Sequence, residues 1–168
     1  MFPDSKAMSI THFLACSSES TPDIFQRGHL YDNADLLSAD SFGRTCLHFT
    51  TSRSNLGVLS YLIKRVSTED VKRKDIQGQT PFHYATESCR SAGAIDTLVC
   101  KGCNIYAVDD TGRTALHWAA RWYLFKTVEK VIAIVGGGTL LLSDTNGRMP
   151  LWEVCHKRAP FLANNLKT

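Results

Sequence analysis

Side chains that could perform acid–base or metal chemistry recur in this sequence at fixed intervals. Glycines at 43, 78, 112 and 147 are spaced by 35, 34 and 35 residues, and an aspartate lies three residues before each one. Catalytic carboxylates usually occur as unlike pairs with divergent pKa values, not one per repeat. We therefore expect each aspartate to accept hydrogen bonds from the backbone amides of the turn that follows it. The aspartates are Asp40, Asp75, Asp109 and Asp144.

Three histidines follow the same register, five residues after the first three glycines: His48, His83 and His117. Equivalent residues of stacked helices lie about 8–10 Å apart. Three imidazoles at that spacing cannot share a zinc ion with bonds of about 2 Å. The run Gly136–Gly138 lacks the Lys and Ser or Thr of a phosphate-binding loop, and there is no nucleophile elbow. We predict a protein that is not an enzyme and has no metal or cofactor.

Each glycine lies in a turn that leads into a helix. The segments are DSFGRTCLHFTT, DIQGQTPFHYAT, DDTGRTALHWAA and DTNGRMPLWEVC, beginning at residues 40, 75, 109 and 144. Gly43, Gly78, Gly112 and Gly147 can adopt the positive φ of a tight turn. In the third copy Thr114 can cap the helix formed by the small and apolar residues after it.

A period near 33 residues carrying T-P-L-H-x-A is the signature of one repeat class. The chain resembles the ankyrin-repeat family from about Asp40 to the C-terminus. The resemblance implies an all-α solenoid of stacked helix-turn-helix units with protruding β-turn loops. It also implies that His48, His83 and His117 bond backbone groups between neighbouring turns.

We interpret the whole chain, 1–168, as a single ankyrin-repeat domain. Residues 1–39 form a degenerate N-terminal cap, in which Ile10–Cys16 echoes the first-helix segment. Repeats follow at 40–74, 75–108 and 109–143, and 144–168 forms a C-terminal cap or a truncated repeat, with Met149 for Thr and Trp152 for His.

Each repeat is expected to contain two helices. Apolar residues at three- and four-residue spacing place second helices after the turn helices. The expected pairs are 45–52 with 56–65, 81–89 with 92–101, 114–121 with 125–135, and 150–156 with 161–166.

Composition is that of a folded domain, with 43% hydrophobic and 21% charged residues. No apolar run is long enough to span a bilayer. The six cysteines, Cys100-x-x-Cys103 included, lack a second pair with metal-ligand spacing. We interpret them as structural or free thiols and predict a reducing compartment, cytoplasmic or nuclear.

The family usually docks partners on the concave side, formed by turn tips and the exposed face of each first helix. Six positions per repeat, 24 in all, lie on these turn tips and helix faces. They hold seven Lys or Arg and two acids, whereas the net charge of the whole chain is only +3. Arg44, Arg113 and Arg148 occupy equivalent places and should form a row. The row is either a binding groove or a solvated face paired with the turn aspartates. Trp122 with Arg121, flanked by Phe42 and Tyr123, is the predicted anchor. The predicted partner-binding residues are Phe42, Arg44, Arg53, Ile76, Gln77, Arg113, Arg121, Trp122, Tyr123 and Arg148.

These features predict a monomeric protein–protein interaction module that binds an acidic or mixed acidic-hydrophobic segment of a protein partner. Polyanion or nucleic-acid binding by the same groove is the alternative. It is disfavoured because the aromatic residues cluster near Trp122 and do not alternate along the groove. A third possibility is a regulatory ankyrin segment of a larger enzyme or receptor.

Overall fold

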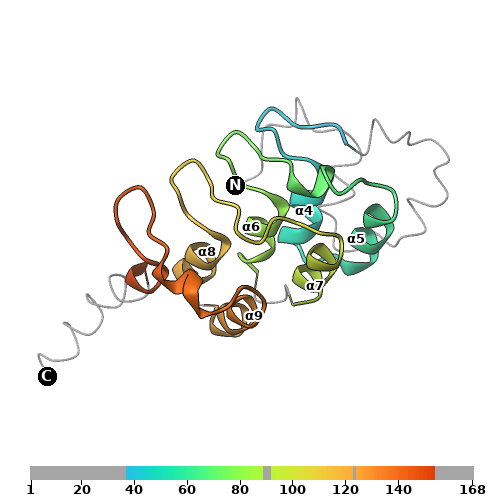
Figure 1. The fold of residues 1–168 in the computed structure, drawn as a ribbon. Coiled ribbons are helices and arrows are strands. Elements are labelled where there is room, and N and C mark those ends of the chain that lie inside the picture. The colour runs from blue at the N-terminus through green and yellow to red at the C-terminus, as the bar shows by residue number, and fades with distance from the viewer. Residues whose placement is uncertain (1–36, 89–91, 123, 154–168) are drawn as a thin grey trace, which may run out of the picture.

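The structure is a computed structural model that describes residues 37–88, 92–122 and 124–153. Its helices form two layers (Figure 1). The first helix of each repeat belongs to one layer: α4 (Cys46–Ser52), α6 (Pro81–Ala85) and α8 (Ala115–Arg121). The second helices form the other: α5 (Leu56–Ile63), α7 (Ala92–Cys100) and α9 (Phe125–Val135). Short 3-10 helices, η1 (Asp70–Lys72) and η2 (Gly137–Leu141), lie in the links, and residues 150–153 are helical.

Packing runs along the stack as well as across it. Within the first layer α4 contacts α6 and α6 contacts α8, while α5 contacts α7 in the second layer. Because each helix buries one apolar face between its neighbours, the core is continuous along the stack. Its largest fully buried apolar side chains are Leu47, Leu59, Leu62, Phe82, Ile95, Leu98 and Leu116. Among the described residues no strand forms, and the all-α solenoid is confirmed.

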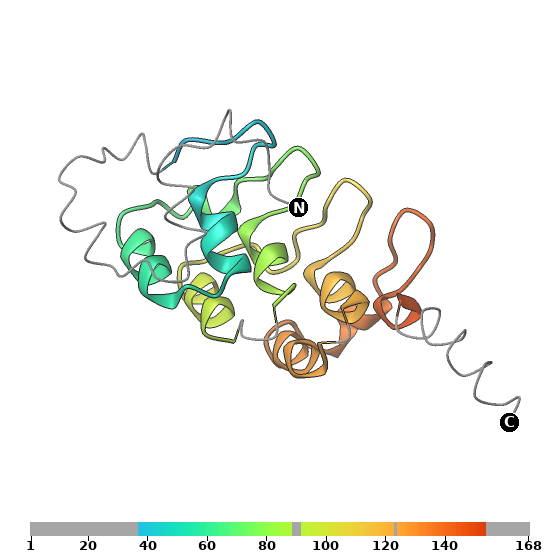
Figure 2. The ribbon, with the colours of Figure 1, turned by 180° about the vertical axis from the view of Figure 1, so that it is seen from behind.

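The four turns project from the same side of the stack (Figure 2). Gly43, Gly78, Gly112 and Gly147 have φ between +73° and +74°, as the turn motif predicts. Neighbouring turns are joined by backbone hydrogen bonds. Ile76 N–H donates to Phe42 O at 3.0 Å, and the equivalent bonds join Asp110 to Gln77 and Thr145 to Thr111. Glycine is required at 78 for a second reason, since a Cβ there would clash with both the backbone and the side chain of Asp110.

The helix bounds differ from the predicted ones at several ends. The largest difference is in α6, which was predicted to reach residue 89 but ends at Ala85. The Thr86 hydroxyl and N–H both donate to His83 O. In a longer helix this carbonyl would accept from the N–H of the residue four positions later. Similarly, α5 ends at Ile63 and not at residue 65, α7 ends one residue early, and α4 and α8 begin one residue late because Thr45 and Thr114 are N-cap residues.

Two predicted regions lie outside the described residues: the N-terminal cap up to residue 36, and the last repeat from residue 154, including its second helix at 161–166. These parts of the domain division stay predictions.

Candidate protein-binding surface

The three histidines connect each repeat to the next one. His48 Nε2 lies 3.3 Å from Gln79 O, His83 Nε2 lies 3.2 Å from Arg113 O, and His117 Nε2 lies 3.0 Å from Arg148 O. In each ring Nδ1 accepts from the backbone N–H of the N-cap threonine at 3.0–3.1 Å. Because Nδ1 is an acceptor, the proton of the neutral ring resides on Nε2 and is donated to the carbonyl.

Burial favours this neutral form. It lowers the pKa of His48 to about 4, and it also lowers the pKa of His83 and His117. The Nε2 contacts of all three are bonds to the backbone of the next turn, as the resemblance implies. Among the described residues, no group of three or more His, Cys, Asp or Glu side chains could hold a metal ion.

Each turn aspartate uses one carboxylate oxygen to hold its own turn. Asp40 Oδ1 accepts from the N–H groups of Phe42 and Arg44 at 2.9 and 2.8 Å. The same pair of bonds, to the residues two and four positions on, recurs at Asp75, Asp109 and Asp144. The prediction made for the aspartates from their spacing is therefore confirmed.

The second carboxylate oxygen has a different partner in different repeats. Arg44 Nε and Nη2 donate to Asp40 Oδ2 at 2.9 and 2.7 Å. Arg148 forms the same forked pair with Asp144. In the two inner repeats the donors are neutral: the Tyr84 hydroxyl donates to Asp75 Oδ2 at 2.9 Å, and the Trp118 indole N–H donates to Asp109 Oδ2 at 3.0 Å.

The pKa values of three of these carboxyl groups reflect the partners. Burial alone would raise the pKa of Asp40, Asp109 and Asp144, but hydrogen bonds lower all three. The donors are arginine and turn amides at Asp40 and Asp144, and at Asp109 they are Thr111, Trp118 and the amide of Arg113. All three aspartates are thus anionic at neutral pH.

The arginine row is consequently paired with acids. Arg113 lies between the third and fourth turns, with Nε 3.4 Å from Asp144 Oδ2 and Nη2 3.6 Å from Glu153 Oε1. Arg44 also stacks on the rings of Phe42 and Phe49, and Arg148 stacks on Trp152. The predicted excess of positive charge counted exposed positions and omitted the aspartates and Glu153 beneath them. With these acids included, the guanidinium charges of Arg44, Arg113 and Arg148 are offset.

The remaining predicted residues divide into two groups. Phe42, Ile76 and Gln77 lie on turn tips and are all exposed, Phe42 at 41% and Ile76 at 61%. Arg53, Arg121 and Trp122 lie at the C-terminal ends of first helices, where Trp122 is 51% exposed. Phe42 and Trp122 are therefore placed two repeats apart along the stack, and Tyr123 lies outside the described residues.

Glu87 completes the row of helix ends, between Arg53 in the repeat before and Arg121 in the repeat after. Burial, with a smaller contribution from the negative charge of Asp75, raises the pKa of Glu87 to about 7. The side chain is therefore partly protonated at neutral pH. The row of helix ends combines cations at Arg53 and Arg121 with a carboxyl group that titrates near neutrality.

Sequence reasoning missed two residues on this side of the molecule. Glu153 is 3% exposed, its Oε1 has no hydrogen-bond partner among the described residues, and Arg113 and Arg121 lie 3.6 and 3.7 Å from its carboxylate. Its sequence signal is a charged residue at the place where the other repeats have Phe49, Tyr84 and Trp118. Phe125, 59% exposed at the start of α9, extends the apolar surface near Trp122.

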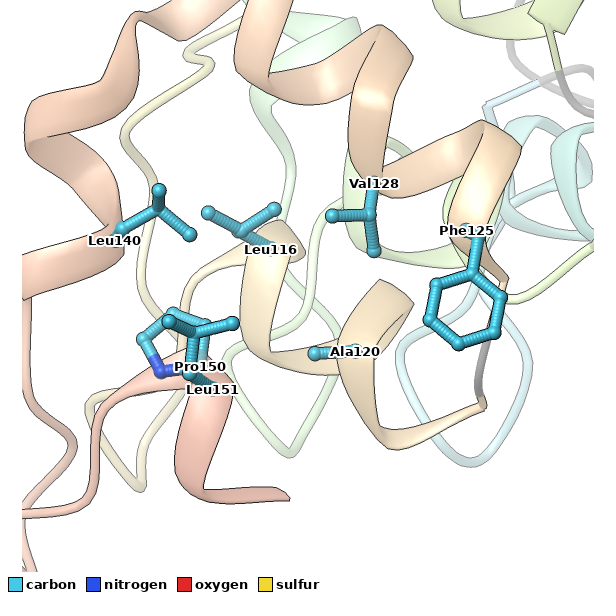
Figure 3. Close-up of a pocket in the computed structure, with 7 residues that line it drawn as sticks. All are labelled: Leu116, Ala120, Phe125, Val128, Leu140, Pro150 and Leu151. Atoms are coloured by element: carbon cyan, nitrogen blue, oxygen red, sulfur yellow. The ribbon is translucent and has the colours of Figure 1, made fainter. Parts of the chain in front are cut away.

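An apolar pocket of about 100 Å³ lies between the third repeat and the start of the fourth (Figure 3). Its walls come from α8, α9, η2 and the helical residues after the fourth turn, and they contain no ionisable side chain. The lining residues are Leu116, Ala120, Phe125, Val128, Leu140, Pro150 and Leu151. As the described residues line it, the pocket can hold apolar groups.

Burial makes two of the described cysteines, Cys46 and Cys103, poorly reactive. Cys46, Cys100 and Cys103 form no disulfide, and burial raises the pKa of Cys46 to about 12 and of Cys103 to about 11. Thiols with such pKa values are poor nucleophiles and poor metal ligands. Cys16, Cys89 and Cys155 lie outside the described residues. No helix in the described part has the length and apolarity needed to cross a bilayer.

The stack, the histidine bridges and the turn aspartates define a helical repeat protein whose exposed turns and helix ends form an extended surface. A family model for ankyrin repeats, in three copies, matches residues 12–109, and the chain belongs to the ankyrin-repeat family. Ankyrin repeats generally mediate protein–protein interaction and are not catalytic.

Similar proteins include neurogenic locus notch homolog proteins. Protein 1 from Homo sapiens is 37% identical over 89 residues, and protein 1 from Danio rerio is 38% identical over 88 residues. Protein 2 from Homo sapiens is 35% identical over 88 residues. Each alignment covers 52% of this chain but only 3–4% of the relative, so the chain spans a small part of these proteins' length.

Proposed function

We propose that the chain is a non-catalytic protein-binding module that holds a mixed acidic-hydrophobic segment of its partner on the concave side of the stack. The observation that carries the proposal is the row of first-helix ends, where Trp122 exposes half of its surface beside Arg121. Large exposed aromatic residues next to arginine are typical of binding hot spots.

The acidic part of the segment would contact cations that are not already held by the turn aspartates. Arg53 is exposed at the end of α4, and 36% of the Arg121 side chain is exposed while its guanidinium lies 3.7 Å from Glu153. Partly exposed cations steer an acidic partner and affect the association rate more than the affinity. Burial of the Trp122 ring would supply most of the affinity.

The same distribution argues against polyanion binding. Three of the predicted basic residues, Arg44, Arg113 and Arg148, have their charge offset by neighbouring carboxylates. A polyanion requires several uncompensated cations, because its affinity comes from the release of counterions. Arg53, together with Arg121 whose guanidinium lies 3.7 Å from Glu153, gives too little.

A capture experiment from cell lysate tests the proposal with three single variants. Trp122→Ala and Arg53→Glu should each reduce the amount of the specifically captured protein, Trp122→Ala by tenfold or more, as expected for a hot-spot aromatic. Lys64→Glu is the matched control, because Lys64 is also exposed but lies at the end of α5 in the second layer of helices. Circular dichroism checks that each variant is folded.

Capture that survives both Trp122→Ala and Arg53→Glu would place the binding surface elsewhere and contradict the proposal. Loss in Lys64→Glu as well would show that the effect is not specific to the row of helix ends. Captured material that disappears on nuclease treatment would instead support a polyanion ligand.

A further inference from the structure

The second turn lacks the arginine that follows the turn glycine in the other three repeats. Gln79 stands in the place of Arg44, Arg113 and Arg148. In consequence the Tyr84 hydroxyl, and not a guanidinium, donates to Asp75 Oδ2. Within the described ranges no cation forms an ion pair with Asp75 or Asp109. The second and third turns, the inner turns, therefore retain negative charge. In the first and fourth turns, the outer turns, an arginine neutralises it.

A groove of about 350 Å³ lies between these two inner turns. Ile76 and Gln77 of the second turn and Asp110 and Thr111 of the third turn line it, together with Trp118 of α8. The hydrogen bond from Asp110 N–H to Gln77 O, 3.0 Å long, fixes the two turns relative to each other. The groove is thus a preformed feature with an apolar wall, since the Ile76 side chain is 61% exposed.

Carboxylates outnumber uncompensated cations around this groove. Asp110 is exposed, packs over Gly78, and forms no ion pair with any described residue. Arg113 also lines the groove, but its guanidinium is 3.4 Å from Asp144 and 3.6 Å from Glu153.

Two further cations lie nearby. The Lys74 ammonium donates to Val108 O at 2.9 Å, and Arg121, which pairs with Glu153, lies 6.0 Å from the centre of the Trp118 ring. Asp75, Asp109 and Asp110 together exceed the single unpaired charge of Lys74. The local balance favours a cation.

We propose that this groove binds one arginine or lysine side chain of the extended partner segment, with the aliphatic stem against Ile76 and Trp118 and the cationic end beside Asp110. Long basic side chains suit such a site because their methylene groups cover apolar surface while their charge stays near water. This inference rests on the proposed function and makes the partner segment one of mixed charge. Its acidic residues lie at the helix ends and its basic residue lies between the turn tips.

The test is a titration that needs no knowledge of the natural partner. The ¹⁵N-labelled chain is titrated with the peptide acetyl-Gly-Leu-Arg-Leu-Gly-amide, and with the same peptide carrying citrulline, a neutral isostere, in place of arginine. The indole N–H of Trp118 reports directly, because it donates to Asp109 within the groove wall. The backbone amides of Ile76 and Asp110 are the second reporters.

We expect the arginine peptide to shift these three signals and to bind about threefold more tightly than the citrulline peptide, as one partly exposed ion pair allows. Asp110→Asn should abolish that difference and leave the fold intact, because the Asp110 hydrogen bond to Gln77 comes from its backbone. Glu129→Gln, which removes an exposed acid on α9, should leave the difference unchanged.

Equal binding of the two peptides, shifts confined to other residues, or an unchanged preference in Asp110→Asn would each overturn the inference. Failure here is distinguishable from failure of the proposed function. A partner whose capture depends on Trp122 can still be found when the groove shows no preference for arginine, and the titration can succeed when no partner is captured.

Discussion

The outer and inner turns of the stack satisfy the same buried carboxylate with different hydrogen-bond donors. All four turns place a buried aspartate whose Oδ1 accepts two turn amides, and each then needs a donor for Oδ2. The outer turns use a guanidinium from the residue after the glycine, Arg44 or Arg148. The inner turns use a ring donor from the first helix, Tyr84 or Trp118.

The difference shows that the geometry of a turn does not depend on whether its carboxylate charge is neutralised. Either donor satisfies the carboxylate, so every turn keeps the same geometry and the stack is regular. A guanidinium also cancels the charge, whereas a hydroxyl or an indole N–H leaves it in place. The third repeat shows this most clearly, because it has both a ring donor and an arginine. The Trp118 indole N–H donates to Asp109, while Arg113 contacts Asp144 of the next turn.

The largest expected effect is the loss of an outer carboxylate charge. Asp144→Asn keeps the Oδ1 acceptor but places an amide N–H₂ against Arg148 and Arg113, so both guanidinium groups lose an anionic partner. We expect the free energy of unfolding to fall by about 3 kcal/mol. Asp75→Asn should cost about 1 kcal/mol or less, because the Tyr84 hydroxyl can rotate and accept from the new amide. Urea denaturation measures both values.

Asp96→Asn is the control for this pair. It removes the charge of an exposed aspartate that forms an ion pair with Lys130, and such a surface pair contributes about 0–1 kcal/mol. Equal losses at Asp144 and Asp75 would mean that the guanidinium contributes no more than the hydroxyl, and the contrast between outer and inner turns would fail.

A smaller effect is expected when an inner turn is converted into an outer one. Tyr84→Phe reproduces Phe49 of the first repeat and leaves Asp75 Oδ2 without its donor, at a cost of about 1–2 kcal/mol. Adding Gln79→Arg reproduces Arg44 and should recover about 1 kcal/mol of that loss. The four proteins of this double-mutant cycle are compared by urea denaturation.

The coupling free energy between Gln79→Arg and Tyr84→Phe decides whether the two donors exchange. If Gln79→Arg has the same effect with Tyr84 and with Phe at 84, the two positions act independently, and the exchange of donors is not what satisfies Asp75. The double variant also sharpens the binding proposal, since a guanidinium in the second turn should lower the preference of the groove for the arginine peptide.

The sequence predicted those parts of the structure that depend on one repeat or on its strict periodicity. The positive φ of the glycines and the Oδ1 bonds of the aspartates recur in all four described turns, and each of the three histidines bonds a backbone carbonyl of the next repeat. Each requires a residue at a fixed offset from the glycine, and that offset is visible in the four aligned segments.

The partners of Oδ2 could not be predicted in the same way. They depend on two positions together, the residue after the glycine and the residue five further on, and in the third repeat on the geometry of the next turn. Counting exposed basic positions therefore overestimated the charge of the concave side. Glu153 was missed for the same reason, since its role depends on Arg113 and Arg121 from the preceding repeat.

The smallest expected effect is a pH-dependent change in the free energy of unfolding. It comes from Glu87, in the row of helix ends, and depends in part on Asp75 of an inner turn. Burial raises the pKa of Glu87 to about 7, whereas the unfolded chain has the ordinary value of about 4.5. Between these values the unfolded state has lost the proton and the folded state still holds it, so the contribution of Glu87 to stability falls as pH rises from 4.5 to 7. Glu87→Gln should therefore stabilise the protein at pH 8 by about 1 kcal/mol, less than the full shift implies because the side chain is only partly buried, and by close to zero at pH 4.5.

The difference between wild type and Glu87→Gln, followed by thermal unfolding from pH 4.5 to 8, isolates this group, because the histidines contribute equally to both proteins. Asp75 is the smaller cause of the raised pKa, and its charge is uncompensated because Gln79 replaces the arginine. Adding Gln79→Arg should therefore lower the midpoint of the Glu87 transition. A midpoint that stays the same would mean that the burial of Glu87 alone sets its pKa, and that the negative charge of the inner turns does not extend to the row of helix ends.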